Sequence, residues 1–161
     1  MLKKKFLFIF LAFVIVAFAF ADDDNGDNGS DNGDGAADYP PQAIFIASYM
    51  GNVDLVTNIL ASSPDKDIRS DSGDTPLNIA MLQRNTTVMK LLLDYGFDPN
   101  AKSTMNGFTP LHSAVSANNA DGARLLLQYR ADKNIKNDDG QTPLDMARKN
   151  DKRDLVLILI R

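Results

Sequence analysis

The 161-residue sequence contains no cysteine and only one histidine. Without cysteine the chain can form no disulfide bond, no cysteine-ligated metal site or cluster, and no thiolate nucleophile. One imidazole leaves little scope for histidine catalysis or for a histidine-rich metal centre. The composition therefore argues against several common classes of enzyme and metalloprotein.

Motifs that would carry chemistry are lacking as well, because none of the ten glycines lies in G-x-x-x-x-G-K-[ST] or G-x-G-x-x-G. Aspartates do occur close together, at 71 and 74 and again at 138 and 139. We expect both sets at solvated loop tips, where carboxylates stay ionised, and not in the partly buried sites that general-acid catalysis needs. The sequence predicts a protein that is not an enzyme and has no catalytic, cofactor-binding or metal-binding residues.

Residues 1–21 read as a signal peptide. Lys3–Lys5 form a basic start, Phe6–Phe20 is an apolar run, and Ala19-Phe20-Ala21 is a small-x-small site, so we predict cleavage before Asp22. The alternative is an uncleaved membrane anchor, for which the apolar run is somewhat short. Both interpretations predict export, to the periplasm or as a secreted protein, and the sequence does not choose between those compartments.

Residues 22–38 contain only aspartate, asparagine, glycine, serine and alanine, so we predict a disordered acidic linker. Its oxygen-rich side chains suit calcium, but no frame fits the EF-hand loop and the chain has no glutamate to close one. Loss of residues 1–21 would remove three of 17 basic residues and none of 21 acidic ones, leaving a net charge of −7. Such a charge argues against nucleic-acid binding.

The rest of the chain is built on one recurring segment. It reads G-D-T-P-L-N-I-A at 73–80, G-F-T-P-L-H-S-A at 107–114 and G-Q-T-P-L-D-M-A at 140–147, with a weaker copy at 42–47. The closing alanines are 33, 34 and 33 residues apart, a period typical of repeat arrays. Threonine suits a helix N-cap, proline the first helical position, and the preceding glycine a tight turn.

The period and the G-x-T-P-L-H-x-A pattern resemble the ankyrin repeat, and segments such as V-M-K-L-L-L at 88–93 and G-F-D-P-N-A at 96–101 resemble its later parts. The resemblance covers about residues 40–161. It implies an all-α solenoid of stacked helix pairs joined by short β-hairpin turns, over residues 39–161. We place the repeats at about 39–69, 70–101, 102–135 and 136–161, and expect Leu77, Leu111 and Leu144 to be buried between them.

The resemblance also implies a concave face, made by the hairpin tips and the exposed side of each first helix, that binds a protein partner. Carried over by position, the candidate partner-binding residues are Tyr49, Met50, Asp74, Leu82, Met105, Phe108 and Gln141. We expect Phe108 to face solvent, because Asp74 and Gln141 stand at its position in other repeats. The histidine position of the family is structural, so we expect His112 to tie turn backbone between neighbouring repeats.

A second surface lies in the final helix, predicted at Asp154–Ile160, where six apolar residues follow one another. Leu157 stands where the other repeats carry Thr57, Lys90 and Arg124, so we expect it to be exposed. Repeat stacks usually end on a polar face. The sequence therefore leaves two functions open: an extracytoplasmic module that binds a protein partner, or a structural or protective scaffold that associates weakly with itself through Leu157.

Overall fold

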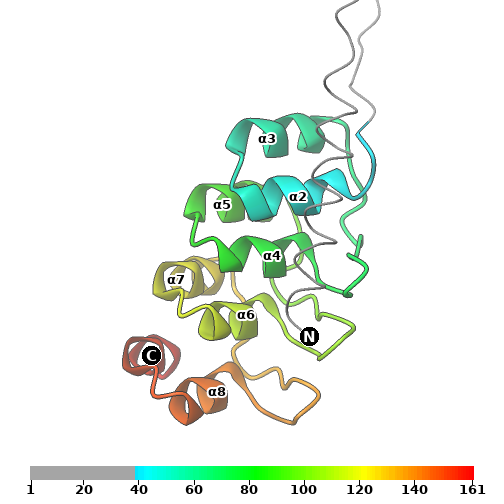
Figure 1. Cartoon of the computed structure of the whole chain (residues 1–161). Coiled ribbons are helices and arrows are strands. Elements are labelled where there is room, and N and C mark those ends of the chain that lie inside the picture. The colour runs from blue at the N-terminus through cyan, green and yellow to red at the C-terminus, as the bar shows by residue number, and fades with distance from the viewer. Residues whose placement is uncertain (1–38) are drawn as a thin grey trace, which may run out of the picture. The chain divides into compact units, whose positions relative to one another are not determined.

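The computed structural model describes residues 39–161, which fold into eight α-helices without a strand (Figure 1). The helices form four pairs: α2 (Ala43–Met50) with α3 (Val53–Ala61), α4 (Pro76–Leu82) with α5 (Thr86–Tyr95), α6 (Pro110–Ser116) with α7 (Ala120–Gln128), and α8 (Pro143–Lys149) with α9 (Arg153–Leu159). The predicted signal peptide and acidic linker lie outside the described residues.

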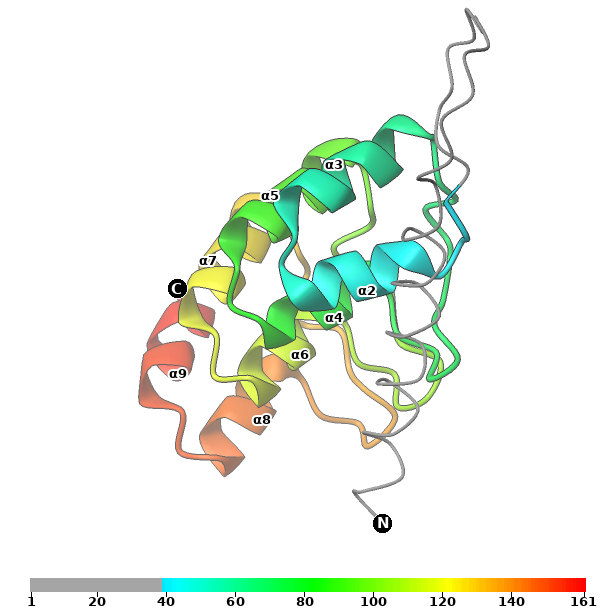
Figure 2. The same ribbon diagram turned by 45° about the horizontal axis from the view of Figure 1, so that its top comes forward.

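The four pairs stack into a solenoid. The first helices of the pairs, α2, α4, α6 and α8, pack side by side in one layer, and the second helices, α3, α5, α7 and α9, pack in the same order in a layer behind it (Figures 1 and 2). We call these the inner and outer helices. The loops that precede α4, α6 and α8 extend to one side of the stack. The predicted all-α repeat architecture is confirmed.

Each inner helix of the last three pairs begins as the repeated segment predicts. The hydroxyl oxygens of Thr75 and Thr142 accept hydrogen bonds from the backbone N–H groups of Asn78 and Asp145, and a proline occupies the first turn. The outer helix α5 ends at Gly96, whose φ of 101° is in the left-handed region that favours glycine. These local signals fix where the helices begin and end.

Two backbone hydrogen bonds of 2.7–3.0 Å close each loop before the last three inner helices. One runs from the N–H of Ser70, Ser103 or Asn137 to the carbonyl of Asp74, Phe108 or Gln141, and the other returns from the N–H of Gly73, Gly107 or Gly140 to the carbonyl of the same Ser70, Ser103 or Asn137. The loops are thus hairpin-like turns without a strand ladder. Neighbouring loops are joined by the Thr104 N–H, which donates to the Gly73 carbonyl at 3.0 Å, and by the Asp138 N–H, which donates to the Asn106 carbonyl at 3.1 Å.

Burial of the three repeated leucines depends on their place in the stack. Leu77 and Leu111 are completely buried, as predicted. The prediction for Leu144 is wrong, because this side chain is only half buried. Leu77 and Leu111 are covered by the following repeat, whereas no described repeat follows α8 and α9.

The last repeat ends the stack with a surface of mixed character. On α8, Arg148 is exposed at the position where Ser48, Met81 and Val115 are buried, so this half of the surface is polar. On α9, Leu157 and Ile160 are 57% and 53% exposed, which confirms the predicted exposure of Leu157. At this end of the stack the exposed surface of α8 is therefore polar, whereas that of α9 is apolar.

Candidate functional site

The predicted partner-binding residues at the C-terminal ends of the inner helices are exposed. Tyr49 and Met50 at the end of α2 are 39% and 51% exposed, and Leu82 at the end of α4 is 49% exposed. Because α2, α4, α6 and α8 pack side by side, equivalent residues of the four repeats form one continuous row. This helix-end row consists of Tyr49 and Met50, Leu82 and Gln83, Ser116 and Ala117, and Lys149 and Asn150.

The other predicted residues belong to the loops that precede the inner helices, which we call the tip row: Asp74, Met105, Phe108 and Gln141. Met105 is 58% exposed. An inner helix of seven residues is about 10 Å long, so its whole length lies between the tip row and the helix-end row. The structure thus divides the predicted site into two parallel rows.

The expectation that Phe108 faces solvent is wrong. The ring is half buried and stacks on the imidazole of His112, with the ring centroids 5.5 Å apart and an interplanar angle of 27°. Asn78 and Asp145 replace this histidine in the neighbouring repeats and offer no ring, which explains why polar residues suffice at positions 74 and 141. A substitution of Phe108 would therefore disturb packing as well as any binding surface.

His112 is buried and bonded through both ring nitrogens. Its Nδ1 accepts from the Thr109 N–H at 3.2 Å and from the Thr109 hydroxyl at 2.8 Å, so Nε2 carries the proton and donates to the Gln141 carbonyl at 3.0 Å. Asn78 makes the corresponding bond one repeat earlier, from Nδ2 to the Phe108 carbonyl at 3.1 Å. The predicted structural role of His112 is confirmed, since the imidazole holds the loop of the next repeat.

We predict that His112 makes the protein less stable as the pH falls from 7 to 5. Burial lowers the pKa of His112 below its ordinary value of 6.5, and the bond to Gln141 offsets only part of this effect. Protons then bind the unfolded chain more readily than the folded one, so the stabilisation is complete above about pH 6.5 and is lost as the pH falls through the lower folded pKa. Melting temperatures at pH 7 and pH 5 measure the loss.

The control for this prediction is His112→Asn, because Asn78 already fills the equivalent position. This variant should show a smaller fall in melting temperature between pH 7 and pH 5. The pKa of Asp94 and that of Asp145 are lowered by hydrogen bonds, so these carboxyl groups titrate below this window. Equal pH dependence of the two proteins would contradict the prediction.

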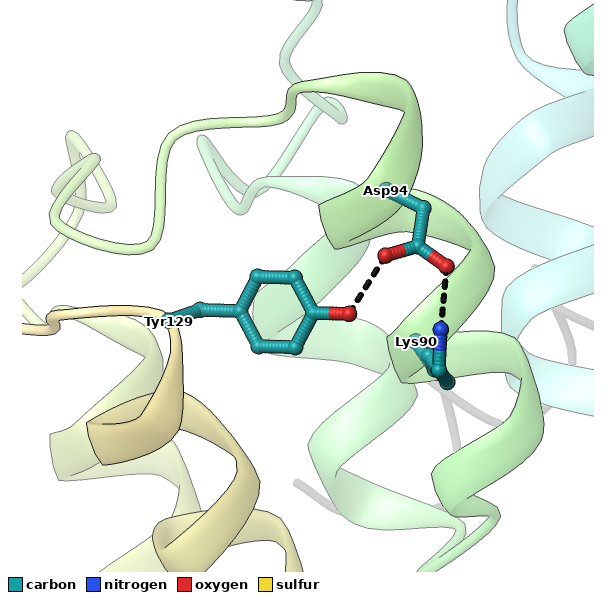
Figure 3. A network of polar contacts seen from close by, with 3 residues as sticks. All are labelled: Lys90, Asp94 and Tyr129. Carbon is teal, nitrogen blue, oxygen red and sulfur yellow. Dashed lines mark hydrogen bonds and ion pairs between the residues drawn. The ribbon is translucent and has the colours of Figure 1, made fainter.

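A polar network on the outer helices connects the second and third repeats. The Asp94 carboxylate on α5 accepts from Lys90, one turn earlier, and from the Tyr129 hydroxyl at the end of α7 (Figure 3). Hydrogen bonds from Lys90 and then from Tyr129 hold the pKa of Asp94 below its usual value. The carboxylate therefore stays ionised and is bonded at both oxygens, which suits a contact that ties neighbouring repeats together.

A half-open pocket of about 270 Å³ lies at the end of the stack, between α8, α9 and the loop before α8. Leu144, Leu159, Ile160, Thr142, Asn134 and Lys133 line it. The Lys133 ammonium donates to the Leu159 carbonyl at 2.9 Å, so this cation stabilises the end of α9. Within residues 39–161, no three His, Cys, Asp or Glu side chains gather as a metal site would need, and no helix has the length and hydropathy to cross a membrane.

Comparison with known proteins agrees with this architecture. A family model described as "Ankyrin repeats (3 copies)" matches residues 43–137, more than half of the chain. The chain belongs to the ankyrin repeat family. Ankyrin repeats generally mediate protein–protein interaction and are typically non-catalytic. No curated protein matches the chain.

The fourth ankyrin repeat extends the stack beyond the matched residues. Its helices α8 and α9 lie after residue 137, yet α8 packs on α6 and α9 on α7 as in the earlier repeats. Thr142, Pro143 and Gly140 keep the pattern of the preceding repeats.

Asparagines that were not singled out in the sequence also tie the ankyrin repeats together. Asn85 and Asn119 cap the outer helices α5 and α7, and each side-chain Nδ2 also donates to the preceding repeat, to the Gly51 carbonyl at 3.1 Å and the Met81 carbonyl at 3.0 Å. Asn85 and Asn119 are 34 residues apart, and this match to the repeat period was the sequence signal that could have identified them. Lys152 replaces the asparagine before α9, so the fourth repeat lacks this bond to the third.

Proposed function

We propose that this ankyrin domain binds a protein partner through the helix-end and tip rows, without catalysing a reaction. The observation that carries the proposal is the exposure of Tyr49, Met50 and Leu82 at the ends of inner helices and of Met105 in a loop. Large apolar side chains are enriched at the centres of protein interfaces. Aspartates at the loop tips would form the rim and tune the association rate and its salt dependence.

We further propose that binding takes place outside the cytosol. The support is the signal-peptide pattern of residues 1–21, with its lysines, apolar run and Ala19-Phe20-Ala21 cleavage site. The partner would then be a periplasmic or extracellular protein. N-terminal sequencing of the exported chain should begin at Asp22, whereas an intact chain in the membrane fraction would favour the anchor.

We predict that Leu82→Asp weakens capture of the partner at least about tenfold, because loss of an apolar anchor at the centre of an interface costs about 2 kcal/mol or more of binding free energy and about 1.4 kcal/mol is already tenfold. The melting temperature should change little, since Leu82 is half exposed at a helix end. The measurement is affinity capture from the native compartment, with the partner identified by mass spectrometry and quantified for both proteins.

Leu157→Asp is the matched control, because Leu157 is similarly exposed but lies on α9, away from both rows. It should leave capture unchanged. Loss of the partner from the Leu157 variant and not from the Leu82 variant would place the binding surface on α9 and refute the proposal for the inner helices.

A structural or protective scaffold is the second candidate, favoured by the exposure of Leu157 and Ile160 on the same helix. Such a protein would associate weakly with itself through α9. Sedimentation of the chain should then show a mass that rises with concentration, and Leu157→Lys should abolish the rise. A monomer at all concentrations would exclude this function.

A further inference from the structure

The helix-end row changes its chemical character along the stack. In the first two repeats three of its four members are apolar, namely Tyr49, Met50 and Leu82, and the fourth is Gln83. The third repeat contributes only serine and alanine. In the fourth repeat the row reaches Lys149, which is exposed. Beside the row, where α9 begins, Lys152 and Arg153 stand next to the carboxylates of Asp151 and Asp154, so residues 149–154 carry a net charge of +1. One end of the row is therefore apolar and the other basic.

The cations Lys149 and Arg153 at the basic end are exposed. Within residues 39–161 the ion pairs are Lys90–Asp94 and Arg124–Asp121, both on outer helices, so Lys149 and Arg153 take part in neither. Arg84 adds a cation between the two ends of the row, since its guanidinium donates to the Ala117 carbonyl at 3.2 Å.

The charge of the whole domain follows the same direction. Residues 39–101 hold four basic and seven acidic residues, a net charge of −3. Residues 102–161 hold ten basic and seven acidic residues, a net charge of +3. The field of the domain thus orients an approaching ligand that carries its negative charge at one end.

We propose that the helix-end row binds a protein segment that is apolar at one end and acidic at the other. The apolar side chains would cover Tyr49, Met50 and Leu82, and the carboxylates would pair with Lys149 and Arg153. Inner helices pack about 8–10 Å apart, so three steps span about 25–30 Å, which an extended chain of about eight or nine residues bridges. The inference rests on the proposed function of these rows and adds the polarity of the partner.

A nucleic acid does not fit this surface. A phosphate backbone needs cations along its whole path, and the half of the row in the first two repeats presents apolar side chains instead. A uniformly apolar segment fits no better, because it would leave Lys149 and Arg153 beside it without a partner. The apolar end and the basic end of the row together favour a protein segment that is apolar at one end and acidic at the other.

The test uses random dodecapeptides displayed on phage and selected against the full chain. Enriched peptides should carry aromatic or aliphatic residues towards one end and aspartate or glutamate towards the other. The best synthetic peptide should lose affinity as salt is raised, which fluorescence anisotropy measures. Enrichment of peptides without this polarity would overturn the inference.

Charge reversal then locates the acidic end of the peptide. Lys149→Glu combined with Arg153→Glu should weaken peptide binding about tenfold or more, and a peptide with lysines in place of its acidic residues should recover the affinity. Lys136→Glu is the matched control, because Lys136 is an exposed lysine of the same repeat that lies ahead of the tip loop. It should have little effect.

The two proposals fail in different ways. If Leu82→Asp abolishes peptide binding but reversal of Lys149 and Arg153 changes nothing, the proposed binding face stands and the inferred polarity is wrong. If no selected peptide responds to Leu82→Asp, the proposed binding face is wrong, and the inference is overturned with it.

Discussion

Gly107→Ala should lower the free energy of unfolding by about 2–5 kcal/mol. Gly107 has a φ of +67°, where an L-residue with a Cβ atom costs about 1–2 kcal/mol. A Cβ atom would also lie 2.3 Å from the Asp138 Oδ1 and 2.9 Å from the Asp138 backbone nitrogen, so the loop of the fourth repeat would have to move. Overpacking of this kind costs about 1–3 kcal/mol more. Urea denaturation followed by circular dichroism measures the loss.

Gly140→Ala is the control for this experiment. Gly140 occupies the same place in the repeated segment and has a similar φ of +74°, but nothing lies within 4 Å of its Cβ position. This variant should be destabilised only by the strain of placing alanine in the left-handed conformation, about 1–2 kcal/mol. If the two variants were equally destabilised, contact between neighbouring loops would not be what requires glycine at position 107.

Leu111→Ala should destabilise the domain by about 2–5 kcal/mol, the usual cost of emptying a buried leucine site. Leu111 is completely buried in the third repeat, within the continuous core that runs through the stack. Since repeats stabilise one another only through their neighbours, the loss should extend to the second and fourth repeats. Urea denaturation gives the free energy, and hydrogen exchange shows which helices lose protection.

The comparison for Leu111 is Leu144→Ala, one repeat later. Leu144 is half buried and lines the pocket at the end of the stack, so its truncation should cost less than half as much and should affect mainly α8 and α9. A larger effect at Leu144 than at Leu111 would contradict the view that the following repeat decides how much each leucine contributes.

The proposed binding surface was predictable in part. The positions of Tyr49, Met50 and Leu82 in the repeat indicated exposed helix ends, and the structure confirms their exposure. Phe108 was misjudged because a position that accepts aspartate in one repeat need not be exposed in another. Its ring lies on His112, a contact that depends on which residue the same repeat carries four positions later.

The sequence by itself determined the period of the repeats, the starts of the inner helices at Thr-Pro and the turns at glycine, because these are local properties of a few consecutive residues. The tertiary structure decided how deeply equivalent residues of different repeats are buried and which atoms lie next to them. Gly107 and Gly140, or Leu111 and Leu144, have the same place in the repeat but different surroundings. Burial, close approach and the apolar-to-basic helix-end row all depend on which repeat lies next to which, and a repeat's own residues do not encode that.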